Sequence, residues 1–147
     1  ISENLWAPMG AEEDANITLD ANGYGLACGG ISASLRDLAR FGIVMLQEGS
    51  INGKQVIPIS WVKDVRHGQH GLPLSKYFKN GSYRNQYWIE DNHIGSHYSL
   101  GVFGQLIYVA PQFNMVAVKF STWPTFSSEE LVNDTANAIA AIARDLS

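Results

Sequence analysis

The hydrophobic positions predict three helices along the chain. Small and apolar side chains recur at helical spacing over residues 35–46, and Ser32 or Ser34 can cap the first turn. A second, short helix begins at Pro58. A capping box over residues 127–130 opens a final helix. Four apolar side chains are expected to share one face of that final helix: Leu131, Ile139, Ile142 and Leu146.

Apolar runs farther along the chain predict three strands, at Tyr83–Glu90, Leu100–Ala110 and Met115–Phe120. Residues 111–114 form a turn, so the last two strands are expected to pair as an antiparallel hairpin. The stretch 67–82 is polar and Gly-rich, which predicts a loop. The order helix, helix, three strands, helix predicts an α+β fold with an antiparallel sheet and packing helices.

Composition narrows the class of protein. The 147 residues are 46% apolar and 16% charged, enough to bury a core, so we expect one folded domain or a piece of one. The net charge of −4, with no basic cluster, argues against nucleic acid and anionic membranes as partners. A single cysteine excludes an internal disulfide. No phosphate-binding loop is present, so no cofactor is predicted.

The start of the chain, Ile1-Ser2-Glu3-Asn4, has no initiator Met and no signal-peptide pattern. This start suggests a processed chain or a piece of a longer one. A cytoplasmic and a periplasmic location are both compatible with the sequence.

Two short patterns have the form of catalytic motifs. Ser60 and Lys63 match Ser-x-x-Lys, in which a lysine one helical turn away takes the proton of the serine hydroxyl. Tyr83 and Asn85 match Tyr-x-Asn. Patterns this short arise often by chance, and the alternatives are a helix cap at Ser60 and a strand edge at Tyr83.

Histidine and cysteine provide two further candidates. His93 and His97 have the spacing of metal ligands on a helix, but Gly95 between them favours a turn, so no metal site is predicted. Cys28 precedes Gly29-Gly30 and is expected either as a small buried side chain or on the wall of a pocket.

Three stretches, taken in order, resemble the C-terminal part of the serine β-lactamase-like hydrolase superfamily. They are Gly29–Gly42 (GGISASLRDLARFG), Asn52–Pro58 (NGKQVIP) followed by Trp61-Val62, and Tyr98–Gln105 (YSLGVFGQ) continuing to residues 121–124 (STWP). The third stretch is most similar to 6-aminohexanoate-dimer hydrolases and related carboxylesterases, relatives of class C β-lactamases. The resemblance covers nearly the whole chain.

The resemblance implies an acyl-enzyme mechanism, in which a serine attacks the carbonyl of an amide or ester and a backbone N–H binds the oxyanion. In this superfamily Ser-x-x-Lys and Tyr-x-Asn precede the first stretch, so both are expected to be missing here. Ser60 and Tyr83 follow that stretch and are therefore interpreted as coincidences.

The third element of the superfamily, Lys-Thr-Gly or His-Thr-Gly, corresponds here to Ser99-Leu100-Gly101. The absence of a cation at this motif favours an amide or ester substrate over a β-lactam. The resemblance implies that the backbone N–H of Val102 is the oxyanion donor, with Ser99 as the fallback. It also implies three substrate-contacting residues: Trp88, Tyr98 and Cys28.

We therefore predict the C-terminal portion of a single β-lactamase-like domain that acts on a small-molecule amide or ester and is inactive alone. Its expected partner is the missing N-terminal part of the same enzyme or a second copy. Without that partner, five side chains are expected to stay partly exposed: Val102, Leu106, Tyr108, Val116 and Val118. The alternatives are a non-catalytic binding or oligomerisation module, and a complete small hydrolase using Ser60 and Lys63.

Overall fold

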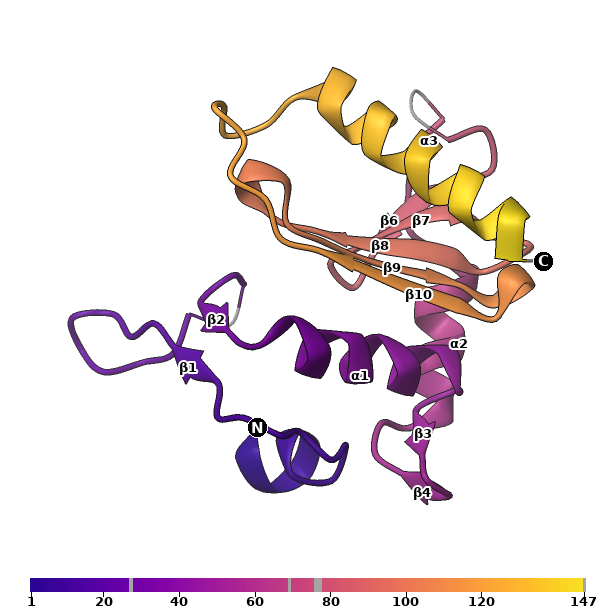
Figure 1. Cartoon of the computed structure of the whole chain (residues 1–147). Helices are drawn as coiled ribbons and strands as arrows, with labels where there is room; N and C mark the ends of the chain where they lie inside the picture. Colours follow the sequence, from indigo (N-terminus) through magenta and orange to yellow (C-terminus); the bar gives the residue numbers. More distant parts are fainter. Residues whose placement is uncertain (27, 69, 76–77, 147) are drawn as a thin grey trace.

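A six-stranded antiparallel sheet forms the centre of the protein (Figure 1). We describe it from a computed structural model, which covers residues 1–26, 28–68, 70–75 and 78–146. The strand order β10-β9-β8-β7-β6-β5 follows the chain, so each strand pairs with its neighbour in sequence. The strands are β5 (Leu72–Pro73), β6 (Ser82–Arg84), β7 (Tyr87–Asp91), β8 (Ser96–Leu100), β9 (Leu106–Ala110) and β10 (Met115–Lys119).

Helices lie on both faces of this sheet. Figure 1 shows α3 (Glu129–Leu146) over one face, and α1 (Leu35–Leu46) and α2 (Ile59–His67) on the other side. This arrangement confirms the predicted α+β class with an antiparallel sheet. A one-turn π-helix (Ser2–Trp6) and two small hairpins complete the described chain: β1 (Asn16–Ile17) with β2 (Ile31–Ser32), and β3 (Ser50–Ile51) with β4 (Lys54–Gln55). No helix in the described ranges has the length and apolar character needed to cross a bilayer.

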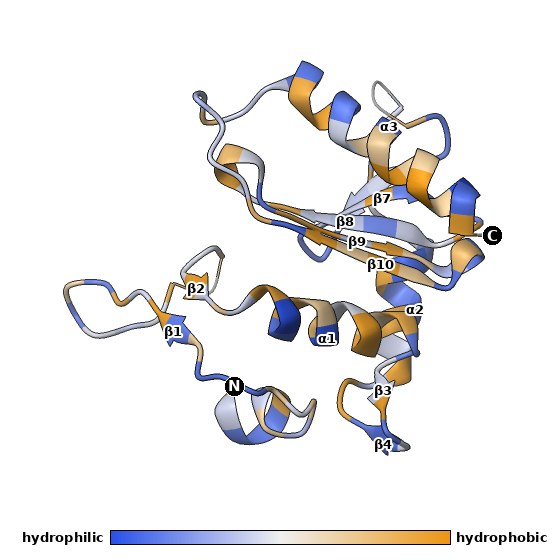
Figure 2. Ribbon diagram, viewed as in Figure 1, coloured by the Kyte–Doolittle hydropathy of each residue, from blue (hydrophilic) through white to orange (hydrophobic). Residues whose placement is uncertain are grey.

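The sheet divides the core into two layers, because successive side chains of a strand point to opposite faces. Tyr98, Leu106 and Tyr108 pack on the α3 side together with Ile139 of α3. On the other side, Val109 packs with apolar residues of α1 and α2: Met45, Val62 and Val65. Figure 2 shows β9 and β10 as hydrophobic strands, consistent with burial between the two helix layers.

A buried carboxylate joins the N-terminal segment to α1. Ser34 caps the helix by accepting a hydrogen bond from the Asp37 N–H at 3.1 Å. The Asp37 carboxylate is itself fully buried and accepts from the N–H groups of Glu12 at 2.9 Å and Glu13 at 3.1 Å, and from Arg40 Nη1 at 2.8 Å. The Glu12 N–H is the main group that holds the pKa of Asp37 below its ordinary value, against the opposing effect of burial.

Two predicted strands are wrong in extent. The run Leu100–Ala110 is interrupted, because β8 ends at Leu100 and a 3-10 turn over Val102–Gly104 precedes β9. Phe103 (φ +55°) adopts the left-handed conformation, which an extended strand cannot contain.

The predicted strand Tyr83–Glu90 is likewise divided into β6 and β7, because Asn85 and Gln86 turn at φ +49° and +66°. The predicted loop at 67–82 also contributes β5 and the start of β6; residues 69, 76 and 77 of that loop lie outside the described residues. The predicted pairing of the last two strands is confirmed as β9 with β10.

The final helix differs from its prediction in its cap and its buried face. Ser128, one residue after the predicted cap, accepts a hydrogen bond from the Leu131 N–H at 3.3 Å. Ile139 and Ala143 are buried, whereas Ile142 is 55% exposed and Leu146 77% exposed. The helix therefore turns its small residues to the sheet in its second half, and the predicted face is wrong there.

The cover provided by α3 also corrects the expected exposure of the sheet. Leu106 and Tyr108 are 7% and 5% exposed, so the expectation that they stay partly exposed is wrong. Val102 is 45% exposed, and Val116 and Val118 are partly buried, as expected.

Candidate functional site

A cavity of about 630 Å³ lies at the Leu100 end of β8, bordered by the turn that follows and by the N-terminal half of α3. Trp88, Leu100, Gly101 and Val102 contribute to its wall. The structure thus brings together one aromatic side chain and the strand end that the sequence singled out.

The register of the sheet explains why Trp88 and Leu100 share this cavity. Trp88 of β7 pairs with Tyr98 of β8, and Leu100 follows Tyr98 by two residues, so all three side chains lie on the α3 side. Tyr98 also lines the cavity, but it is only 6% exposed. Its ring stacks on Tyr108 at 4.2 Å and on Phe78 at 6.1 Å between ring centroids, which makes it part of the floor.

The turn after β8 leaves one backbone donor available. The Gly101 N–H donates to the Gln105 carbonyl at 2.9 Å, and the Gln105 N–H donates to the Val102 carbonyl at 3.4 Å. Among the residues that the structure describes, no group accepts a hydrogen bond from the Val102 N–H. Val102 is thus a residue of the cavity wall whose N–H has no hydrogen-bond partner among the described residues.

Ser99 faces away from the cavity, since it alternates with Tyr98 and Leu100 along β8. Its hydroxyl forms a hydrogen bond with the Tyr87 hydroxyl on the side of α1 and α2. Burial raises the pKa of Tyr87 to about 12, with the Ser99 hydroxyl opposing that shift. The Ser99 side chain thus belongs to the opposite layer.

Cys28 is not brought to this site. It is exposed in the connection between β1 and β2, and it is not part of the cavity wall that contains Trp88 and Val102. Figure 1 shows this connection beyond the N-terminal end of α1, away from α3.

The two short motif-like patterns do not come together: Tyr83 pairs with Trp88, with ring centroids 5.4 Å apart, whereas Ser60, Lys63 and Asn85 lie on the side of α2. Ser60 and Lys63 are both exposed on α2. The Asn85 amide donates to the Asp64 carboxylate at 2.7 Å, beside the Arg84 Nε at 2.8 Å. The Arg84 hydrogen bond is the main cause of the lowered pKa of Asp64. Asn85 is thus engaged in an ion-pair network between α2 and β6.

The two histidines with metal-ligand spacing, His93 and His97, lie in different environments. His93 is exposed in the turn before β8, whereas His97 is 1% exposed, and its Nδ1 donates to the Gly95 carbonyl at 2.8 Å. Burial lowers the pKa of His97 to about 4, so the ring is neutral at pH 7. Within residues 1–26, 28–68, 70–75 and 78–146, no three His, Cys, Asp or Glu side chains are grouped as metal ligands would be.

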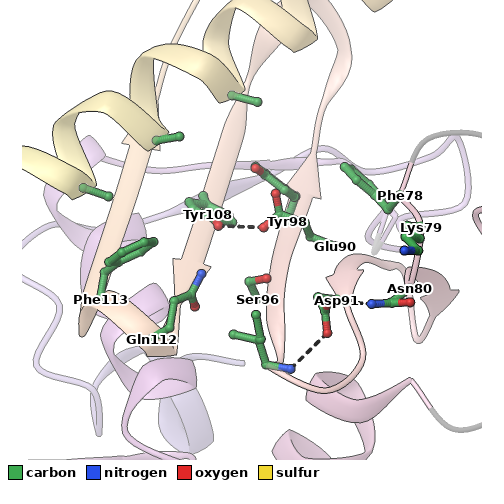
Figure 3. A pocket seen from close by; sticks show the side chains of 14 residues that line it. Phe78, Lys79, Asn80, Glu90, Asp91, Ser96, Tyr98, Tyr108, Gln112 and Phe113 are labelled. Atoms are coloured by element: carbon green, nitrogen blue, oxygen red, sulfur yellow. Dashed lines mark hydrogen bonds between the residues drawn. The ribbon is translucent and has the colours of Figure 1, made fainter.

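A second cavity of about 450 Å³ lies under the C-terminal half of α3 (Figure 3). The Tyr108 hydroxyl donates to the Glu90 carboxylate at 2.7 Å in its wall. Burial raises the pKa values of Tyr98 and Tyr108, so both hydroxyls stay protonated and act as donors at neutral pH. Sequence reasoning missed this cluster; the alternation that places Tyr98, Tyr108 and Glu90 on one face was its only signal.

Comparisons with known proteins show which hydrolases this chain is similar to. No family model matches the chain. A 6-aminohexanoate-dimer hydrolase from Paenarthrobacter ureafaciens is 38% identical over 129 residues, which cover 84% of this chain. The solved structure named "Putative 6-aminohexanoate-dimer hydrolase from Bacillus anthracis" superposes with a TM-score of 0.84 at 35% identity over 99% of this chain. This chain is homologous to part of the 6-aminohexanoate-dimer hydrolases.

The chain spans 33% of the length of the Paenarthrobacter hydrolase and 37% of the Bacillus protein. The resemblance drawn from the three sequence stretches is confirmed, and the coverage agrees with a portion of a longer hydrolase. The homologues belong to the amidase-type hydrolases.

Proposed function

We propose that this chain supplies the oxyanion-binding strand and one cavity wall of a serine hydrolase that cleaves a small amide or ester through an acyl-enzyme. The single observation that carries this proposal is the unpaired N–H of Val102 in the wall of the 630 Å³ cavity. The homology to 6-aminohexanoate-dimer hydrolases supports the reaction class.

In this proposal the Val102 N–H donates to the carbonyl oxygen of the substrate while negative charge develops on it. A donor already fixed in the strand stabilises that charge without reorganisation during the reaction. Trp88 and Leu100 provide an apolar wall for the carbon chain of the substrate. The nucleophilic serine and its base come from a segment outside this chain.

Replacing Val102 with proline tests the assignment, because it removes the N–H with little other change. Val102 is the first residue of a 3-10 turn, and Gly101 before it is extended (φ −104°, ψ 168°), a conformation that suits the residue before proline. Pro111 already begins the 3-10 turn after β9 in the same way.

We expect Val102→Pro to lower kcat of the enzyme that contains this chain by roughly a hundred- to a thousandfold, the usual effect of removing one oxyanion donor. Ile59→Pro is the matched control, since Ile59 is the exposed first residue of α2 and also follows an extended residue, Pro58. An unchanged kcat in Val102→Pro would show that the Val102 N–H is not an oxyanion donor.

We also propose that the chain works only when bound to a nucleophile-bearing segment or a second copy. Its exposed surface is 9185 Å², about a quarter more than the roughly 7,400 Å² expected for a compact 16.1 kDa monomer. In the described part of the chain, β10 pairs on one side only, which leaves an edge for a further strand.

A fluorophosphonate probe and intact-mass measurement test the inactivity of the isolated chain. We expect no adduct on the chain alone and one adduct on the complete enzyme. A stoichiometric adduct on Ser60 of the isolated chain would instead support a self-contained hydrolase.

A further inference from the structure

The turn that carries Val102 is held by residues 119–126, which begin at the last residue of β10 and which we name the clamp segment; its Trp123 and Phe126 line the same cavity as Val102. Both backbone polar groups of Phe103 are bonded to it: its N–H donates to the Phe126 carbonyl at 3.0 Å, and its carbonyl accepts from the Trp123 N–H at 3.2 Å. The rings of Phe103 and Phe126 also meet edge to face, with centroids 5.9 Å apart.

Gln105 fixes the other end of the turn. Its side-chain Nε2 donates to the Ser121 carbonyl at 2.5 Å, and its Oε1 accepts from the Ser121 N–H at 3.1 Å. One side chain therefore pairs with both backbone groups of Ser121, as a neighbouring strand would. Because the Gln105 carbonyl also accepts from the Gly101 N–H, Gln105 connects the clamp segment to the residue before Val102.

The Trp123 ring packs against Gly104 at the end of the turn. An added Cβ on Gly104 would lie 2.5 and 2.8 Å from ring carbons Cδ2 and Cζ2 of Trp123, so the ring presses directly on the Gly104 backbone. Lys119 donates to the Gly104 carbonyl at 3.3 Å and lies 4.7 Å from the centroid of the Trp123 ring. The Trp123 indole and the Lys119 ammonium group thus both restrain the backbone at Gly104.

The backbone of the turn needs such support. Phe103 adopts φ +55°, ψ +24°, a left-handed conformation that is unfavourable for a residue with a side chain and persists where surrounding contacts impose it. Those contacts come from the clamp segment, which engages Phe103, Gly104 and Gln105 but leaves the N–H of Val102 unpaired.

From this geometry we infer that Gln105 and Trp123 are positioning residues, which set the direction of the Val102 N–H through the clamp segment. The inference rests on the proposed function of Val102 and adds that the direction of this N–H depends on contacts with Ser121 and Trp123, some twenty residues farther along the chain. Neither side chain needs to touch the reacting atoms for this role.

A double-mutant cycle in the enzyme that contains this chain separates positioning from general stability. Gln105→Met removes both hydrogen bonds to Ser121 with little change in size. Gln55→Met is the matched control, because the Gln55 amide also binds backbone carbonyls, those of Glu48 at 3.0 Å and Ile57 at 2.5 Å, in a hairpin remote from the cavity. Both single variants and the Gln105→Met/Val102→Pro double variant are assayed for kcat, KM and melting temperature.

We expect Gln105→Met to lower kcat by roughly tenfold to a hundredfold, the size of effect that a small misplacement of a catalytic group produces, with KM changed by less than about twofold. Gln55→Met should lower the melting temperature but leave kcat unchanged. In the Val102→Pro background, Gln105→Met should cause no further loss of kcat, because the donor it positions is already gone.

Independent, multiplicative losses in the double variant would overturn the positioning role, as would an unchanged kcat in Gln105→Met while Val102→Pro is impaired. An unchanged kcat in Val102→Pro would instead overturn the proposed function itself, so the two failures are distinguishable. If Gln105→Met does not fold, Trp123→Leu replaces it in the same cycle, with the same expected and contrary results.

Discussion

Replacing Gly104 with alanine should destabilise the fold through its contact with Trp123. Gly104 has φ +85°, which costs a residue with a Cβ roughly 1–2 kcal/mol. The new methyl group would also overlap the Trp123 ring, and overpacking of this kind typically costs about 1–3 kcal/mol. The two effects together predict a loss of about 2–5 kcal/mol in the free energy of unfolding.

Gly23→Ala is the control that separates these two costs. Gly23 also has φ +85°, but an added Cβ there would meet nothing within 4 Å. It should therefore show the backbone cost alone, roughly 1–2 kcal/mol. Urea denaturation of both variants gives the difference, which measures the contact with Trp123.

Thermal melting provides a second readout. A protein of this length loses roughly 2–4 °C in melting temperature per kcal/mol, so Gly104→Ala should melt on the order of 10 °C below the wild type. Adding Trp123→Ala should return the cost of Gly104→Ala to that of Gly23→Ala. Equal losses in Gly104→Ala and Gly23→Ala in the presence of Trp123 would refute the account of the turn given above.

Three further predictions concern titration and assembly. Asp37→Asn should lower the urea midpoint far more than Asp20→Asn, because the Asp20 carboxylate also accepts two backbone N–H groups but lies in an exposed loop; equal effects of the two variants would contradict this prediction. Because folding lowers the pKa of Asp37, its contribution to stability is present above about pH 4 and is lost as the pH falls through the folded pKa. His97, buried beside Arg66 and Tyr87, has a pKa of about 4 in the folded protein against about 6.5 in the unfolded chain. The free energy of unfolding should therefore decrease by roughly 3 kcal/mol as the pH falls from 6.5 to 4, and an unchanged pH profile of unfolding in His97→Gln would show that another group is responsible. Sedimentation of the purified chain should show an oligomer or a marginally stable monomer, whereas a monomer with a high, concentration-independent melting point would mean that the exposed surface needs no partner.

Periodicity predicted the three helices and the β9–β10 hairpin, because their apolar residues recur at regular spacing within one uninterrupted segment. It did not predict the break after β8, because Val102 and Phe103 are apolar residues that suit a strand, and the left-handed φ of Phe103 is set by contacts with the clamp segment. The turn at Asn85-Gln86 was missed because aromatic residues on both sides of it continue the apolar run.

The residues of the candidate site were predicted from the resemblance to a known superfamily and not from periodicity. The alternation along β7 and β8, seen only in the structure, brings Trp88 and Leu100 to one cavity. It also turns Ser99 to the opposite layer. The position of Cys28 depends on the irregular connection between β1 and β2, for which no periodicity exists. The roles inferred for Gln105 and Trp123 depend on a contact between segments that no local pattern encodes.

The order of the strands has a consequence for how this region folds. Every pairing in the six-stranded sheet joins strands that are consecutive in the chain, so each step closes only a short loop at low entropic cost. Local pairing of this kind speeds folding. The strand end that carries Val102 and the segment that fixes it are therefore expected to reach their native geometry by successive hairpin formation, without waiting for distant segments. In the proposed enzyme, the direction of the Val102 N–H would then be set before this chain meets the nucleophile-bearing segment, and docking would determine only how the two parts are placed.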